Sequence, residues 1–132
     1  MQEEKKKIAL YENFKTINTE LTQRLHDKAY LNAYTYYKIG RYKSAIVSLK
    51  NALKQYPESS HREEIMYLIV DASYRFASNS VAEKQTDRYL SMLDSYLSFK
   101  EEFPESAHIK SLDRMAQQAR DYLDRNNKDN NI

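Results

Sequence analysis

The chain contains one short motif twice, and the two copies hold its only two prolines. The copies are Tyr56–Ser59 and Phe103–Ser106, and each reads aromatic residue, proline, glutamate, serine, with the two prolines 47 residues apart (57 to 104). Proline cannot continue a helix, and a serine that follows it is suited to capping the next one. The same link used twice predicts a stack of helical hairpins.

Composition supports an all-α fold of about five helices in one domain. The 132 residues include a single glycine, Gly40, so the chain lacks the residues that β-turns and phosphate-binding loops require. With 21 basic and 19 acidic residues, the net charge is only +2, which predicts no general attraction to nucleic acid or anionic lipid. The sequence has no cysteine, which excludes disulfides and cysteine zinc sites from it. Protein partners are the expectation that remains.

Apolar residues recur at steps of three and four from Ile8 onward, which predicts an N-terminal helix. Whether residues 1–26 form one helix with the segment after them stays open, because Asn18 or Thr19 could begin a new helix. Gly40 is predicted to end that segment in the left-handed conformation, before a second helix that ends near Tyr56.

Two serine–glutamate pairs have the spacing of a capping box and predict the starts of the next helices. Ser60 with Glu63 opens the third helix, and Ser80 with Glu83 opens the fourth. A fifth helix is expected from about Ser106.

These elements divide the chain into a single tetratricopeptide-like domain, residues 1–125, and a tail. The predicted parts are an N-terminal helix at 1–26, a first repeat at 27–57, a second and degenerate repeat at 60–104, a capping helix at 106–125, and a disordered tail at 126–132. The tail is polar and rich in asparagine, which is typical of segments that bury too little apolar surface to fold.

The first hairpin has the residue spacing of a tetratricopeptide repeat. Ala33 and Ala45 fall where two helices must approach closely, so small side chains are expected there. The second unit departs from the pattern: Phe99 stands where the first has Ala52, and we expect its turn to be lengthened through residues 78–85. The residues that match the repeat are Ala33, Tyr36, Gly40, Tyr42, Ala45, Leu49, Ala52 and Pro57.

A longer set of residues matches the pattern of a known family. They are Leu21, Arg24, Leu25, Lys28, Ala29, Tyr30, Ala33, Tyr36, Tyr37, Lys38, Gly40, Tyr42, Ala45, Ile46, Tyr56 and Pro57. Through these residues the chain resembles the BamD family, over roughly residues 20–123. The resemblance implies an α-α superhelix and a periplasmic lipoprotein at the outer membrane, in the machine that inserts β-barrel proteins. It also implies that this chain is the C-terminal part, which docks on the POTRA domains of BamA and contacts other subunits, with the lipid anchor lying outside this sequence.

Two groups of side chains are candidates for binding a protein partner. Tyr30, Tyr34 and Tyr37 recur along one helix face and could line the concave groove, since tyrosine rings give large contact area at low entropic cost. The alternative for each ring is ordinary packing against a neighbouring helix. The second group is basic and surrounds the first hairpin turn; equally well it is a solvated rim. Its members are Lys38, Arg41, Lys43 and Lys50.

No catalytic, cofactor or metal site is predicted. His26, His61 and His108 lie on separate elements, and none has a second histidine three or four residues away, as a helical zinc pair requires. Carboxylates are spread along polar faces, and no serine has the setting of a nucleophile elbow.

The sequence therefore predicts a non-catalytic binding scaffold, cut from a longer protein, that works at the periplasmic face of the outer membrane. Two alternatives remain: a tetratricopeptide adaptor of another periplasmic or cytoplasmic complex, and a non-catalytic domain of a longer enzyme. Residues 1–7 are charged and polar, so they do not form a signal peptide or a membrane span.

Overall fold

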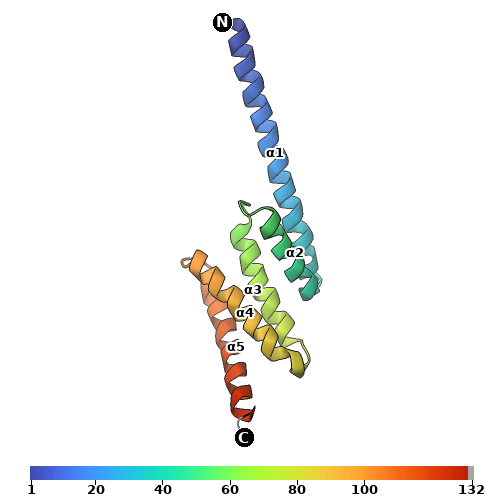
Figure 1. The fold of residues 1–132 in the computed structure, drawn as a ribbon, viewed down its shortest axis with the longest axis vertical. Coiled ribbons are helices and arrows are strands. Elements are labelled where there is room, and N and C mark those ends of the chain that lie inside the picture. The colour runs from blue at the N-terminus through green and yellow to red at the C-terminus, as the bar shows by residue number, and fades with distance from the viewer. Residues whose placement is uncertain (131–132) are drawn as a thin grey trace.

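The computed structural model describes residues 1–130, and it contains five α-helices and no strand within that range (Figure 1). The all-α prediction is therefore confirmed. The helices are α1 (Gln2–Lys38), α2 (Tyr42–Gln55), α3 (Arg62–Ser78), α4 (Ala82–Glu102) and α5 (Ile109–Asn130).

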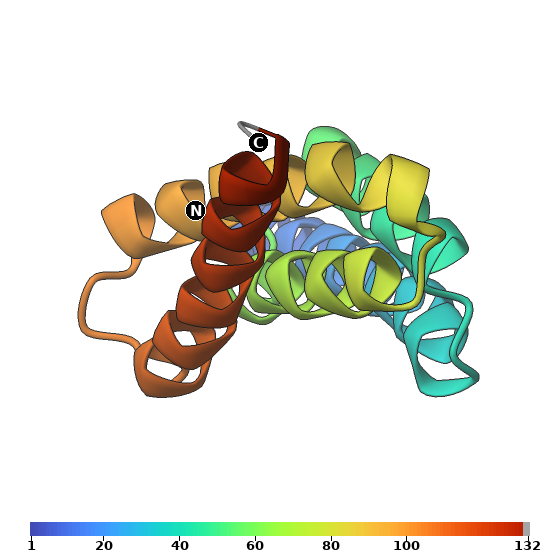
Figure 2. The ribbon, with the colours of Figure 1, turned by 90° about the horizontal axis from the view of Figure 1, so that it is seen from below.

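Consecutive helices form antiparallel hairpins, an arrangement consistent with a tetratricopeptide-like repeat. Figure 2 shows α2 and α4 in one layer, with α1 and α3 in the other and α5 across the end. Helix α3 contacts each of the other four helices. It therefore has buried residues around much of its circumference, including the continuous run Leu68–Ser73.

The core consists of two clusters that meet at α3. The first joins α1, α2 and α3 and contains Ala33, Ala45 and Leu49, all fully buried. The two alanines that the repeat pattern predicted to be small thus lie inside the first hairpin. The second cluster joins α3, α4 and α5 around Phe99, which is also fully buried. A chain of this size thus buries two small cores in series, as expected of stacked repeats.

The question left open at the N-terminus is answered by a single continuous helix of 37 residues. Its C-terminal half packs on α2 and α3, whereas its N-terminal half extends away from the other helices (Figure 1). Every side chain from Met1 to Leu25 is exposed. We call residues 2–21 the arm.

The hairpin turns differ from the sequence prediction in one respect. Gly40 has a φ of +82°, which confirms the left-handed residue after α1. The turn between α3 and α4, however, comprises only residues 79–81, so the expected lengthening through 78–85 is wrong. The extra residues of the second hairpin lie in its helices: α4 has 21 residues and α2 has 14.

Both predicted capping boxes are wrong. Helix α3 begins after His61 and α4 after Val81, and neither has a side-chain cap. Ser80 Oγ instead donates to the carbonyl oxygen of Phe76, at the end of the preceding helix. The serine of the repeated tetrapeptide bonds the turn before the helix instead. Ser59 Oγ accepts a hydrogen bond from the backbone N–H of His61, two residues later, at 3.1 Å.

The last helix also departs from its predicted limits. It begins at Ile109, because Ser106 Oγ accepts the backbone N–H of His108 at 3.1 Å in a turn that precedes it. It continues to Asn130, so the prediction of a disordered tail is wrong for residues 126–130. Residues 131–132 of the expected tail lie outside the described part of the chain.

Candidate protein-binding site

The three predicted tyrosines of α1 form a line of stacked rings. Tyr30 and Tyr34 have ring centroids 5.9 Å apart, and Tyr34 and Tyr37 6.1 Å. Tyr42, at the start of α2, meets Tyr37 edge-on at 6.0 Å. All four rings are half-buried against the first core cluster. Packing and surface exposure are thus combined in the same side chains.

Tyr30 also takes part in a contact between repeats. The His61 ring lies parallel to the Tyr30 ring at 4.4 Å, and His61 Nε2 is 2.6 Å from Asp27 Oδ1. This hydrogen bond, with a second from Gln23, lowers the pKa of Asp27. A histidine from the turn before α3 is therefore held by two residues of α1.

Tyr37 makes the second contact between α1 and α3. Its hydroxyl donates to Asp71 Oδ1 at 2.8 Å, and Arg75 Nε donates to the same oxygen at 2.6 Å. Asp71 is only 2% exposed, so these two donors compensate a buried carboxylate. Burial, together with the hydrogen bond to Asp71, raises the pKa of Tyr37, and the hydrogen bond to Asp71 raises the pKa of Arg75.

The same contacts recur one repeat later. His108 stacks on Tyr67 at 3.7 Å, and His108 Nε2 is 3.0 Å from Glu64 Oε2. Tyr74 donates to Gln118 Oε1, as Tyr37 does to Asp71. In each junction, one helix provides an acid and two tyrosines. The acid bonds to a histidine of the following hairpin or end helix and one tyrosine stacks on it. The second tyrosine donates a hydrogen bond to an acceptor on the helix after that histidine.

Sequence reasoning missed these junctions, although it could have found one signal. His61 and His108 each follow the repeated proline by four residues. The repeated motif therefore extends from four residues to six, and its last position is the one that reaches the preceding repeat.

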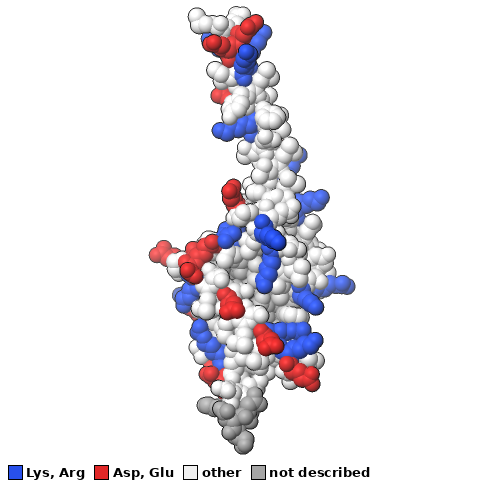
Figure 3. Space-filling view, viewed as in Figure 1, with Lys and Arg blue, Asp and Glu red and all other residues white. Residues whose placement is uncertain are grey.

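The four predicted basic residues do not all come together. Arg41 and Lys43 line an open pocket of about 320 Å³ at the tips of the two hairpins. Lys50 lines a different pocket, with Leu53 and Asp94, between α2 and α4. Lys38 is exposed in the last turn of α1. In the view of Figure 3, Lys and Arg side chains are prominent on the side of the body where α1 and α2 lie.

The sequence did not predict two further residues of the pocket that Arg41 and Lys43 line. Phe76 comes from α3 and Arg88 from α4, and the Arg88 guanidinium carbon lies 4.0 Å from the centre of the Phe76 ring. We call this pocket the tip pocket. Its full lining is Gly40, Arg41, Tyr42, Lys43, Ser44, Phe76, Asn79, Ser80 and Arg88.

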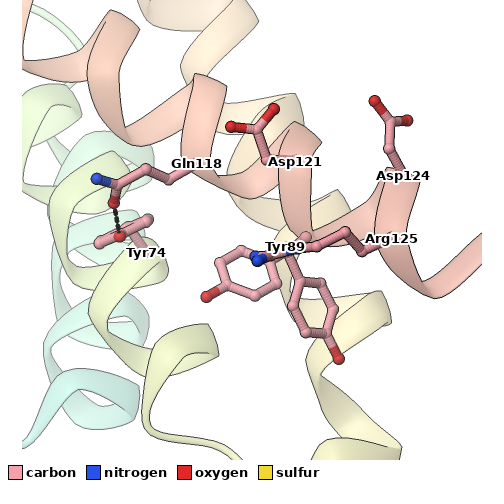
Figure 4. A pocket seen from close by; sticks show the side chains of 7 residues that line it. Tyr74, Tyr89, Gln118, Asp121, Asp124 and Arg125 are labelled. Carbon is pink, nitrogen blue, oxygen red and sulfur yellow. Dashed lines mark hydrogen bonds between the residues drawn. The ribbon is translucent and has the colours of Figure 1, made fainter.

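A larger pocket of about 620 Å³ lies at the other end of the array, between α3, α4 and α5. Figure 4 shows Gln118 bonded to Tyr74, and Arg125 extending toward Tyr89. The carboxylates of Asp121 and Asp124 point away from the tyrosines. Its charged groups therefore do not converge on a common point, as those of a ligand site do.

The histidines do not form a metal centre. Within residues 1–130 no group of three or more histidine, cysteine, aspartate or glutamate side chains could hold a metal ion. His61 and His108 are engaged at the junctions, and His26 packs against Tyr56 with centroids 4.7 Å apart.

No helix in the described part of the chain combines the length and apolar character needed to cross a bilayer.

Comparisons with known proteins identify the family. No curated protein matches the chain. The model of the YfiO family, described as outer membrane lipoprotein, matches residues 9–129, which include all the side chains of both junctions and the tip pocket. The chain therefore belongs to this BamD-like family of outer membrane lipoproteins.

Proposed function

We propose that this chain is a non-catalytic scaffold that docks on the periplasmic POTRA domains of a BamA-like barrel-assembly subunit. It would work at the periplasmic face of the outer membrane, with other subunits of the same machine as further partners. Membership of the outer membrane lipoprotein family supports the location and the assembly role. The resemblance to BamD supports the choice of partner.

One observation carries the binding role: the array fixes its own shape and leaves other polar groups exposed. Tyr30 and Tyr37 are bonded or stacked within the junctions, so they hold adjacent repeats in a defined orientation. Arg41 and Lys43 are exposed at the hairpin tips. A preorganised surface loses little conformational entropy on binding, which is how a rigid helical array acts as a docking platform.

The tyrosine face and the basic residues remain our candidate docking groups. They are Tyr30, Tyr34, Tyr37, Lys38, Arg41, Lys43 and Lys50. Tyr34 is the α1 tyrosine for which we expect the larger loss of binding on substitution, since its ring stacks only on neighbours of its own helix.

The test is isothermal titration of the chain with the purified cognate POTRA domains. We expect binding, weakened in Tyr34→Ala and in the double variant Arg41→Glu, Lys43→Glu. The matched control is Thr35→Ala, an exposed position on the same helix whose hydroxyl donates to the carbonyl oxygen of Leu31, one turn earlier in that helix. Absence of measurable binding by the wild-type chain would overturn the proposal.

A further inference from the structure

We infer that the tip pocket is a docking site for an acidic segment of a partner protein. The inference rests on the proposed protein-binding function and specifies the chemistry of the partner. It depends on three features of the pocket: the sign of its charges, the way one guanidinium is held, and its size.

The charges of the lining are all of one sign. Arg41, Lys43 and Arg88 are its only charged members among the described residues. They come from the α1–α2 turn, the first turn of α2, and α4, so only the folded chain brings them together. The acids closest along the chain, Glu83 and Asp87, are exposed on α4 and do not line the pocket. An occupant that neutralises this lining must be anionic.

Arg88 is held in place by two side-chain contacts. Its guanidinium lies over the Phe76 ring, and its Nη1 donates to Ser80 Oγ. Stacking on one face and a hydrogen bond at one nitrogen fix the plane of the group. The remaining N–H donors keep the planar fork that suits a carboxylate.

The pocket also has aromatic walls and a limited size. Phe76 and Tyr42 provide apolar surface beside the cations. A volume of about 320 Å³ accommodates a few side chains rather than a folded element. The occupant that fits is an extended or turn segment carrying aspartate or glutamate next to an apolar residue.

Arg75 lies beside the tyrosine face, where its charge is paired with Asp71. Its Nε is bonded to Asp71, and its guanidinium carbon lies 6.0 Å from the centre of the Tyr37 ring. Tyr37 in turn meets Tyr42 of the tip pocket. A segment that leaves the tip pocket along this path passes over aromatic rings, so the two predicted groups of binding residues meet here.

The experiment measures fluorescence anisotropy of a labelled peptide that alternates glutamate and phenylalanine. Its control replaces each glutamate by glutamine. We expect the acidic peptide to bind and the glutamine peptide to bind roughly tenfold more weakly or not at all, because charged hydrogen bonds are lost. Arg88→Gln and Lys43→Glu should each weaken the acidic peptide severalfold. Lys54→Glu, at an exposed position in the last turn of α2 and outside the tip pocket, is the matched charge control and should leave the affinity within about twofold, the effect expected of a distant surface charge.

Equal affinity for the two peptides, or equal effects of Lys43→Glu and Lys54→Glu, would overturn the inference. Lys43 is exposed, and its side chain makes no hydrogen bond to any residue in the described part of the chain. Its variant therefore tests the site even where Arg88→Gln disturbs packing on Phe76. Vesicles of phosphatidylcholine with phosphatidylglycerol, and inorganic phosphate, are the competing anions. If the vesicles or inorganic phosphate displace the labelled peptide at a lower concentration than the unlabelled acidic peptide does, the pocket binds a phosphate group instead.

The two proposals can fail separately. Binding to the POTRA domains that is unaffected by Lys43→Glu would remove the acidic-segment site and leave the scaffold function intact. Binding of the acidic peptide without any affinity for POTRA domains would support the acidic-segment site and overturn the proposed docking on POTRA domains.

Discussion

The junction between α1 and α3 and the junction between α3 and α5 are built from equivalent contacts but over different lengths of chain. Tyr30 and Tyr67 are 37 residues apart, whereas His61 and His108 are 47 apart. Both histidines nevertheless stack on a tyrosine from the first helix of the preceding hairpin, α1 or α3. The longer α4, on the opposite layer, contains most of the extra residues. The junction contacts of α1, α3 and α5 are thus preserved, while the helices between them, α2 and α4, differ in length.

The junctions differ in the charge of their second contact. Tyr37 donates to Asp71, a buried carboxylate, whereas Tyr74 donates to Gln118, an exposed amide. A buried carboxylate is costly unless it is paired, so the first junction depends on Tyr37 and Arg75 together. The first junction should therefore tolerate substitution less well than the second at this contact.

The largest effect should come from the core position at which the repeats differ most. Phe99 is fully buried where the first repeat has Ala52, so Phe99→Ala would leave a cavity between α3, α4 and α5. We expect a loss of about 3–5 kcal/mol in the free energy of unfolding, measured by urea denaturation. Leu97→Ala, an exposed position on the same helix, should cost less than about 1 kcal/mol. Similar losses for the two would contradict the role of Phe99.

Substitution at the second contact should separate the junctions directly. Asp71→Ala removes the acceptor of Tyr37 and of Arg75, and we expect a loss of about 2–4 kcal/mol. Gln118→Ala removes an exposed hydrogen bond and should cost about 0.5–1 kcal/mol. Thermal and urea unfolding of both variants provide the measurement. Asp71→Asn retains an acceptor and is expected to fall between them; a loss larger than that of Asp71→Ala would argue against hydrogen bonding as the cause.

The histidine contacts should behave alike. His61→Phe and His108→Phe keep a ring to stack on Tyr30 or Tyr67 and remove only the hydrogen bond to the acid. We expect each to lower the unfolding midpoint by about 3 °C, as a single partly exposed hydrogen bond would. Hydrogen exchange should increase at the start of α3 in the first variant and at the start of α5 in the second. Exchange that increases equally at both sites would show that the junctions are not independent.

The smallest effect is a dependence on pH that Asp27 provides. Its pKa lies below the usual 3.8 in the folded chain, so the unfolded chain takes up this proton first as pH falls. The stabilisation is present above about pH 4 and is lost as the pH falls through the folded-state pKa. Asp27→Asn should thus be less stable than the wild type at pH 6, with the difference shrinking toward pH 3. His61→Phe should show the same convergence, since the bond to His61 is the main cause; parallel curves would contradict it.

The sequence predicted the elements better than the contacts between them. Proline at 57 and 104 fixed the ends of the hairpins, because the ring cannot continue a helix. Gly40 has the left-handed conformation that its position after α1 predicted. The capping boxes failed at Ser60 and Ser80: each helix is capped one residue later, at His61 and at Val81, and the Ser80 hydroxyl bonds to Phe76 instead.

The candidate site was only half visible in the sequence. Arg41 and Lys43 follow a glycine turn, and local composition was enough to select them. Arg88 was not selected, because it lies on a different hairpin and its neighbours along the chain give no sign of a pocket. Likewise, Tyr37 and Asp71 are 34 residues apart, so their hydrogen bond has no local signature.

By itself the sequence determined an all-helical chain, the position of the proline links between its hairpins, the small residues of the first hairpin and the family to which it belongs. The helices, their turns and the small residues follow from backbone sterics and from periodicity, which act over a few residues at a time. The family follows from the resemblance of specific residues to a known pattern. Only the tertiary structure decided that α1 is one helix with an exposed arm, that the histidines join successive repeats, and that Arg88 lines the same pocket as Arg41 and Lys43. Such contacts depend on how helices pack against each other, and packing brings together residues whose separation along the chain carries no information about their distance in space.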